Sequence, residues 1–364
     1  MAETTHKLRT RTKLFYGIGD LGNALVNSAI QFFLMKFYTD AALILPALAG
    51  NALLIGKIWD AVNDPLFGWI TDKTKSRFGK RRVFMIFGAI PLGISIALLW
   101  FVPKADLTAT FIWIAATFIL FDTLWTLTNV PYYSLTSELT DDYDERSSLT
   151  TYRMVMAVPA YLIGVALTPV IVGLFALQRT GYAFIGILYG IIAAVVLLVS
   201  AAGLRERKDL VTAKPETSPL KSLLIAIKNK PFVKLCGIYF IINISFAFIK
   251  ILMAYYIEYQ LLMKAETSLV MGLMLVCVTL SLPFWQWVSR KIDKGPAYGL
   301  GMLIGGAAVV LTFFLPHHST MLIYLIAVLA GFGFSAQWIF PWAMVADVAD
   351  YDRLETGQQR SGVY

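Results

Sequence analysis

The chain has 364 residues, of which 58% are hydrophobic and only 15% are charged, and its mean hydropathy is +0.67. Soluble domains carry about 25% charged residues, so the composition excludes an ordinary soluble domain and indicates a polytopic membrane protein. The net charge of +8 does not indicate a nucleic acid partner, because the basic residues lie between apolar runs. The two cysteines, Cys236 and Cys277, fall inside apolar runs and indicate neither a disulfide framework nor a metal cluster.

The first 13 residues are polar and basic, without the short apolar core and cleavage site of a signal peptide, so we expect a cytoplasmic tail. Runs of about 20 apolar residues can cross a bilayer as helices. We predict ten such spans, near 14–38, 44–71, 83–103, 109–138, 151–177, 180–203, 232–260, 266–288, 296–316 and 319–345. The predicted fold class is therefore an all-α polytopic membrane protein.

The basic residues of the connections predict the topology. They concentrate in the N-terminal tail and in every second connection, at 73–82, Arg146, Arg153, 205–234 and 290–294. The other connections hold only Lys104, Arg179 and Lys264. Because Lys and Arg are enriched in cytoplasmic loops, we predict a multi-pass protein of the plasma membrane, bacterial inner membrane by expectation, with a cytoplasmic N-terminus.

A charged connection, LRERKDLVTAKPETSPLKS, follows the sixth predicted span and contains two prolines. Such a stretch is typical of a linker. We expect a first unit at residues 1–203, a cytoplasmic linker at 204–231 and a second unit at 232–364.

The two units share motifs at corresponding places. GWITDKTKSRFGKRR follows the second span and QWVSRKIDKGPAYG the eighth, while DYDER follows the fourth and DYDRLE the tenth. Recurrence six spans apart indicates a duplicated six-helix unit, a layout of many secondary transporters. On this interpretation the second unit ends after its fourth helix, and we expect a truncated chain rather than a genuine ten-helix protein.

Three charged residues, Lys57, Asp60 and Asp64, interrupt the second apolar run. Their spacing places all three on one stripe of a helix with 3.6 residues per turn. A carboxylate near the bilayer midplane costs about 2.5–3.5 kcal/mol even on a lenient insertion scale, so these side chains must face water or a partner. Two acids together can bind Na⁺ or share a proton. A Lys57–Asp60 ion pair that only holds helices together is the structural alternative.

Four stretches carry a resemblance to a known family: YGIGDLGN (16–23), KIWDAVNDPLFGWITDKTKSRFGKRR (57–82), NVPYYSLTSELTDDYDER (129–146) and VADVADYD (345–352). They resemble the glycoside–pentoside–hexuronide:cation symporters, the melibiose-permease-like branch of the major facilitator superfamily. The resemblance covers essentially the whole chain, and WDAxNDP is its most specific element. It implies a major facilitator fold of two six-helix bundles around a central cavity, and transport of a small solute with Na⁺, H⁺ or Li⁺.

The resemblance implies a cation site on the second and fourth spans, formed by Asp60, Asn63, Asp64, Thr126 and Asn129. The family has an acid at the position of Asn129, so one charge is missing here, which weakens the expectation of Na⁺ and leaves H⁺ open. Asp122, two turns earlier on the fourth span, is a candidate for compensation or else lies nearer the outer mouth.

The resemblance also implies a solute site. Its matching residues are Asn23, Trp125, Asn129, Tyr133, Arg153 and Trp338, and we add the intramembrane Asp20 as a residue that binds solute or ties spans together. Aromatic rings stack on sugars, although any single Trp or Tyr can equally belong to the interfacial belt. Ala24 and Asn129 stand where the family carries the acids that hold a galactoside, so another sugar, a uronate or an amphiphile fits as well.

A set of charged and glycine residues is expected to gate the cavity on its inner side. Glycine permits a tight turn and close helix approach, and Asp72 can pair with Arg or cap a helix. The alternative is plain solvated charge. The set comprises Gly68, Asp72, Arg77, Gly79, Arg81, Arg146, Arg290, Asp347 and Asp350.

These observations leave several functions open. The first is a monomeric secondary transporter that moves a small solute, a carbohydrate by expectation, with Na⁺ or H⁺ by alternating access. The second is a carrier of an amphiphilic or lysolipid-like solute on the same fold. An enzyme is disfavoured, because no His lies inside a predicted span and no nucleophile–base motif occurs. A non-transporting remnant is the fourth. No cofactor is expected beyond the coupling ion.

Overall fold

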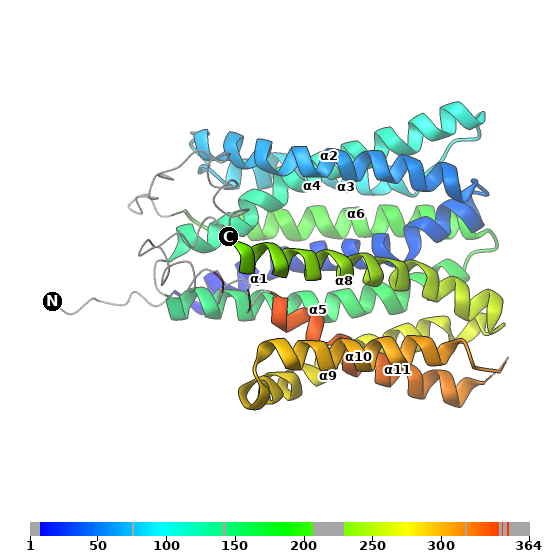
Figure 1. Cartoon of the computed structure of the whole chain (residues 1–364). Helices are drawn as coiled ribbons and strands as arrows, with labels where there is room; N and C mark the ends of the chain where they lie inside the picture. The colour runs from blue at the N-terminus through cyan, green and yellow to red at the C-terminus, as the bar shows by residue number, and fades with distance from the viewer. Residues whose placement is uncertain are drawn as a thin grey trace. The chain divides into compact units, whose positions relative to one another are not determined.

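The computed structural model describes residues 8–74, 76–140, 143–206, 229–316, 319–341, 344 and 348 (Figure 1). Within these residues the regular structure is helical and no strand occurs. The chain divides into two compact units, Met1–Thr212 and Ala213–Tyr364. The proposed linker at 204–231 falls mostly outside the described residues and stays a prediction.

The described part of the first unit contains six long helices. The first of them, α1, continues without a break into turns of wider, π-helical geometry at Ile30–Leu34 and Phe37–Ala41. The six are α1 (Thr10–Ala29), α2 (Pro46–Lys73), α3 (Arg82–Leu99), α4 (Leu107–Leu139), α5 (Tyr143–Gly173) and α6 (Gln178–Gly203).

The second unit contains four long helices among its described residues. They are α8 (Lys230–Tyr255), extended by a π-helical turn at Tyr256–Gln260, α9 (Thr267–Ile292), α10 (Lys294–Thr312) and α11 (Thr320–Phe334). A short 3₁₀ turn at Lys264–Glu266 precedes α9. After a turn at Ser335, a further helical segment covers 336–341.

Eight helical segments are long and apolar enough to cross a membrane, and they match the third to tenth predicted spans. They are Arg82–Leu99, Leu107–Thr136, Ser148–Gly173, Gln178–Gly203, Lys230–Gln260, Lys264–Ile292, Lys294–Thr312 and Thr320–Pro341. The first two predicted spans are helical as well, as α1 and α2, but they are not among the eight. Both carry charged residues along their length, which is what a helix with an intramembrane site requires.

Small residues set the helix packing of the first unit. α1 packs against α5 and α6, α2 against α4, and α3 against α4 and α6. At the α3–α6 contact, a Cβ on Gly190 would lie 2.3 Å from the carbonyl oxygen of Gly93. Without a hydrophobic force between helices in lipid, such close backbone approach provides the van der Waals contact that holds helices together.

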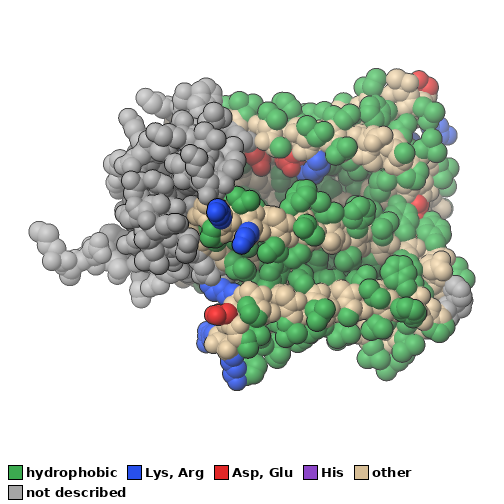
Figure 2. Space-filling model, viewed as in Figure 1, with side chains coloured by type: hydrophobic (Ala, Val, Ile, Leu, Met, Phe, Trp, Pro, Cys, Tyr) green, Lys and Arg blue, Asp and Glu red, His purple; other side chains and the backbone are tan. Residues whose placement is uncertain are grey.

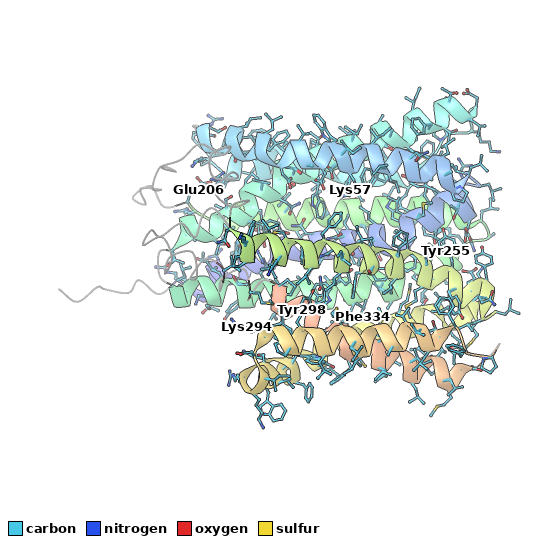
Figure 3. All side chains as sticks on the ribbon, in the orientation of Figure 1. Lys57, Glu206, Tyr255, Lys294, Tyr298 and Phe334 are labelled. Carbon is cyan, nitrogen blue, oxygen red and sulfur yellow. The ribbon has the colours of Figure 1, made fainter. Side chains whose placement is uncertain are left out.

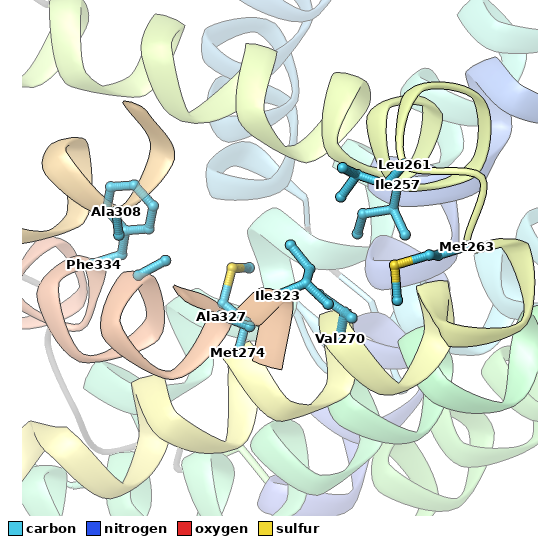
Figure 4. Close-up of a cluster of buried hydrophobic side chains, with 10 residues drawn as sticks. Ile257, Leu261, Met263, Val270, Met274, Ala308, Ile323, Ala327 and Phe334 are labelled. Atoms are coloured by element: carbon cyan, nitrogen blue, oxygen red, sulfur yellow. The ribbon is translucent and has the colours of Figure 1, made fainter. Parts of the chain in front are cut away.

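The second unit packs around two apolar clusters. The larger one joins α9, α10, α11 and the turns after α8 through side chains such as Ile257, Val270, Met274 and Ile323 (Figure 4). The other surrounds the fully buried Trp285, whose Nε1 donates to the backbone oxygen of Phe332 at 2.7 Å.

The outward surface of the helices is largely apolar. In the space-filling view, green hydrophobic side chains cover most of the visible face, with a few acidic and basic side chains among them (Figure 2). A soluble monomer rarely exposes large contiguous apolar areas. The surface is therefore the one that a lipid bilayer solvates.

Candidate functional site

A group of charged side chains lies where α2 meets α4. Lys57 Nζ lies 3.0 Å from Asp60 Oδ2 on the same helix and 3.8 Å from Asp122 Oδ1 on α4. The Lys57 ammonium also lies over the ring of Phe118, 5.7 Å from its centroid. Figure 3 labels Lys57 partway along α2, well inside the helix. One ammonium therefore serves two carboxylates at membrane depth.

Asn63 lies one turn from Asp60 and is fully buried. Its Nδ2 donates to the backbone oxygen of Asp122 at 3.2 Å and to Asp122 Oδ2 at 3.5 Å. Its Oδ1 has no hydrogen-bond partner within the described part of the chain. A buried polar atom without a partner costs about 1–3 kcal/mol, and an amide oxygen beside carboxylates is a ligand that hard cations accept.

Asp64 and Thr126 form the next contact along the same two helices. Thr126 Oγ1 donates to Asp64 Oδ1 at 2.9 Å, while Trp59 Nε1 donates to Thr123 Oγ1 at 2.9 Å and fixes the helices in register. The structure thus brings together four of the predicted cation-site residues and adds Asp122. Asn129, the fifth, lies elsewhere.

Asn129 pairs with α1 rather than with the acids of α2. Its Oδ1 accepts a hydrogen bond from Asn23 Nδ2, and its own Nδ2 donates to the backbone oxygen of Trp125 at 3.1 Å. Asn23 and Asn129 are both buried. Asn23, expected in the solute site, and Asn129, expected in both the cation and the solute site, are therefore direct partners.

The polar residues of α4 form one continuous stripe. Asp122, Thr126, Asn129 and Tyr133 are spaced by four, three and four residues, which places them on one face of the helix. Asp122 and Thr126 contact α2. Asn129 and Tyr133, further along the helix, contact α1. The stripe therefore links the acid group on α2 to a second polar group.

This second group consists of Asp20 on α1, Tyr133 on α4 and Arg153 on α5. Arg153 Nε lies 3.4 Å from Asp20 Oδ2, and Tyr133 Oη donates to Asp20 Oδ1 at 3.3 Å. The Arg153 guanidinium stands over the Tyr133 ring, 5.0 Å from its centroid. Asp20 is buried, whereas the Tyr133 side chain is substantially exposed, so one side of this group is open to a ligand.

Two predicted solute residues have other surroundings. The Trp125 ring is partly buried and packs against Phe121, with centroids 5.4 Å apart. Trp338 lies half-exposed on the segment 336–341 of the second unit. A solute site that combines Trp338 with residues of the first unit joins the two units and stays a prediction.

The predicted gate residues are placed unequally. Arg81 is buried and its Nη1 donates to Thr71 Oγ1 at 2.6 Å, whereas Arg77 is exposed and covers the ring of Phe78. Within the described residues, no heavy atom lies within 4 Å of the position that a Cβ on Gly68 would take, and the expected close helix approach at this residue stays a prediction. The tight turn instead falls at Gly79, with φ of +107°.

Of the remaining gate residues, only Arg290 has a described side chain. Arg290 is exposed in the last turn of α9. The side chains of Asp72 and Arg146, and residues Asp347 and Asp350, lie outside the described residues.

The sequence reasoning missed Glu206, which fixes the loop between α2 and α3. Its carboxylate accepts hydrogen bonds from the backbone N–H groups of Lys80 (2.5 Å), Arg81 (2.8 Å) and Arg82 (2.7 Å) (Figure 3). These N–H groups lie at the N-terminus of α3, where the first turn of a helix offers no internal acceptor and an anion is favoured. A Cβ on Gly79 would lie 2.5 Å from Glu206, which explains the glycine. The available signal was a single acid in the basic run LRERK directly after the sixth span.

Among the described residues, no group of three or more His, Cys, Asp or Glu side chains comes together as a metal centre. The α2–α4 group instead offers two carboxylates, an amide oxygen and one ammonium. Such a donor set can hold a proton or a monovalent hard cation.

Comparisons with known proteins place this geometry in context. A family described as MFS/sugar transport protein matches residues 15–364. An uncharacterized symporter of Synechocystis sp. is 27% identical over 99% of this chain and 82% of its own length. A sodium-dependent lysophosphatidylcholine symporter of Gallus gallus is 28% identical over 98% of this chain and 74% of its own. A sphingosine-1-phosphate transporter of Xenopus tropicalis is 30% identical over 97% and 74%.

A solved structure shares the fold. The crystal structure of a bacterial homologue of the human lysosomal transporter Spinster, in an inward-facing and occupied conformation, aligns with a TM-score of 0.60 and 16% identity. The alignment covers 95% of this chain and 75% of that chain.

Proposed function

The chain belongs to the MFS/sugar transport protein family of the major facilitator superfamily, and from this premise we propose that it couples movement of an amphiphilic, lysolipid-like solute to Na⁺ or H⁺. The predicted all-helical, multi-pass major facilitator architecture is confirmed. The relatives with assigned roles are named as transporters, so we propose secondary transport and no enzymatic activity.

The α2–α4 acid group carries the proposal of cation coupling. Asp60 and Asp122 share Lys57, and the buried Asn63 Oδ1 is unpartnered beside them. Charged groups at membrane depth are costly, and in transporters they mark ion pathways. Asp60, Asn63, Asp64 and Thr126 would supply the oxygens that receive Na⁺, with Asp122 in the position of a further acid. For H⁺, the two carboxylates would hold one proton between them.

The α4 stripe supports a mechanism for coupling. The acid group contacts one part of the stripe, and the Asp20–Tyr133–Arg153 group contacts the other. A cation that pulls the oxygens of α2 and α4 together changes how α4 presents Asn129 and Tyr133 to α1. Solute affinity then depends on cation occupancy, as coupling between two sites requires.

An amphiphilic solute is preferred to the sugar that the family resemblance first predicts. Relatives named for lysophosphatidylcholine and for sphingosine-1-phosphate align over 74% of their own lengths. Arg153 offers a cation to an anionic head group, and Ala24 and Asn129 replace the acids that a galactoside would need. A carbohydrate remains the second candidate, because the matching family is described as MFS/sugar transport protein and Tyr133 offers an exposed ring.

The remaining expectations concern the surroundings of the protein. We propose a location in the plasma membrane with a cytoplasmic N-terminus, on the distribution of basic residues. The partners are the solute, the coupling cation and the lipid bilayer, and we propose that the transporter acts as a monomer.

Uptake into vesicles containing the purified chain tests the proposal. Radiolabelled lysophosphatidylcholine, a hexoside, a pentose and a hexuronate are each offered under a Na⁺ gradient alone and under a proton gradient alone. Asp60→Asn is the test variant, and Asp106→Asn, an exposed acid before α4, is its matched control. We expect gradient-driven uptake of the lysolipid that Asp60→Asn abolishes and Asp106→Asn retains. Uptake of a sugar alone supports the second candidate, and uptake insensitive to both gradients contradicts cation coupling.

A further inference from the structure

The contact between Lys57 and the two acids is asymmetric. The Lys57 side chain is 60% exposed, whereas that of Asp122 is 3% exposed. The ammonium is thus free to leave on a flexible four-carbon stem, while the acids are held by their helices. A lysine that served only as a structural tie would be expected to be as buried as its partners.

Lys57 does not contact all of the side-chain oxygens that surround it. The ammonium lies 3.0 Å from Asp60 Oδ2, within hydrogen-bond distance. It lies 3.8 Å from Asp122 Oδ1, which is too far for a hydrogen bond. Asn63 Oδ1, buried one helical turn from Asp60, has no hydrogen-bond partner among the described residues. The site therefore has oxygen ligands left over after Lys57 is counted, and a small cation seated among them would complete the set.

Electrostatics makes the ammonium and a bound cation competitors. Lys57 Nζ lies 3.0 Å from Asp60 Oδ2, so a cation bound to the same oxygen would stand within a few ångströms of the ammonium, and the two positive charges would repel each other. The Phe118 ring offers the ammonium a face on which to rest close to the acids. The group is therefore suited to hold one cation at a time between Asp60 and Asp122.

We propose that Lys57 is a tethered substitute for the coupling cation: it occupies the Asp60–Asp122 pair when Na⁺ is absent and is displaced when Na⁺ binds. This inference rests on the proposed cation coupling and adds the residue that sets the apparent affinity. Because Lys57 blocks the site for part of the time, the apparent dissociation constant for Na⁺ is raised by the inverse of the unblocked fraction. The exchange also keeps the acid pair compensated in the ion-free protein.

Chemical labelling of lysine measures the exchange directly. The full chain in detergent is treated with an amine-reactive ester, in NaCl or in choline chloride of equal concentration, and labelling of each lysine is followed by peptide mass spectrometry. Lys264 is the matched internal control, because it is 67% exposed and lies 3.0 Å from Glu258 outside the site. We expect Na⁺ to accelerate labelling of Lys57 several-fold and to leave Lys264 unchanged. Asp60→Asn should raise Lys57 labelling in choline and remove the response to Na⁺.

Thermal unfolding at increasing Na⁺ concentration supplies the second readout and separates the possible failures. If Lys57 blocks the site nine-tenths of the time, the Lys57→Gln variant should bind Na⁺ about tenfold more tightly than the wild type. If Na⁺ stabilises the protein but Lys57 labelling does not respond, or Lys57→Gln weakens Na⁺ binding, the exchange is wrong and cation coupling stands. If Na⁺ changes neither labelling nor stability and uptake ignores both gradients, the proposed function fails as well.

Discussion

The two units are built from similar long helices but place their polar groups differently. In the first unit, acids, amides and an arginine meet between α1, α2, α4 and α5, at the depth of the membrane. In the described part of the second unit, the charged side chains lie near helix ends, as Lys230, Glu258 and Arg290 do. Its helices instead meet through apolar clusters around Met274 and Trp285.

The difference separates stability from function. Close packing can hold a helix bundle together in lipid, and the described part of the second unit relies mainly on its two apolar clusters, supplemented by buried hydrogen bonds such as that of Tyr298 to Gln337. The polar stripe of the first unit consists instead of side chains that are costly in lipid. Its presence in the first unit supports the proposal that this unit carries the coupling chemistry.

The largest expected effect comes from the acids of α2. Asp60→Asn removes the charge that Lys57 contacts and leaves Lys57 with Asp122 alone. Because Asp60 is a ligand of the proposed cation site, we expect its loss to reduce gradient-driven uptake by about 100-fold, which corresponds to about 2.8 kcal/mol. The rate of gradient-driven uptake at saturating solute, compared between Asp60→Asn and the wild type, measures this decrease. Wild-type coupling in Asp60→Asn, or equal loss in Asp106→Asn, would remove the distinction between the units.

Packing of the second unit is tested by a pair of glycines. A Cβ on Gly333 of α11 would lie 2.3 Å from the backbone nitrogen of Gly305, whereas one on Gly306 would meet no described atom within 4 Å. Overpacking costs about 1–3 kcal/mol, so Gly333→Ala should lower the midpoint of thermal unfolding in detergent. Gly306→Ala is the matched control and should leave it unchanged or slightly raised. Equal midpoints would show that close approach does not hold this unit together.

The loop between α2 and α3 provides the next test. Glu206→Ala leaves three backbone donors of Lys80, Arg81 and Arg82 without their carboxylate, at about 1.5–3 kcal/mol for bonds to a charged group. We expect trypsin to cut this loop several-fold faster, because the loop opens more often. Glu206→Gln keeps an acceptor and should fall between. A cutting rate unaffected by either change would mean that Glu206 does not fix the loop.

The smallest effect concerns one buried tyrosine in each unit. Tyr132 Oη donates to the backbone oxygen of Tyr16 at 2.6 Å, and Tyr298 Oη donates to Gln337 Oε1. Removing either hydroxyl should cost about 1 kcal/mol. Thermal unfolding of Tyr132→Phe and Tyr298→Phe should therefore show similar small decreases. If only one variant is destabilised, buried hydrogen bonds do not support the two units alike.

The helices and the acid stripe could be predicted from the sequence because they depend on local patterns. Apolar runs gave the spans, and spacing placed Lys57 and Asp60 on one face of α2. Which face of one helix meets which face of another is a property of packing. The sequence alone could not show this, and Asn129, expected beside the acids of α2, in fact accepts a hydrogen bond from Asn23 of α1. Glu206 escaped notice because its partners are backbone groups more than a hundred residues away.

The measurement that tests the central claim is the Na⁺ affinity of the purified chain with and without lysophosphatidylcholine, in the wild type and in Asn129→Leu. We predict that the solute tightens Na⁺ binding by a factor in the range of about 5–150, as is typical of coupled sites. Asn129→Leu, which breaks the stripe at its contact with Asn23, should bring this factor close to one. Thr128→Ser, beside the stripe and bonded only within α4, should keep it. A factor of one in the wild type, or an unchanged factor in Asn129→Leu, would contradict coupling through α4.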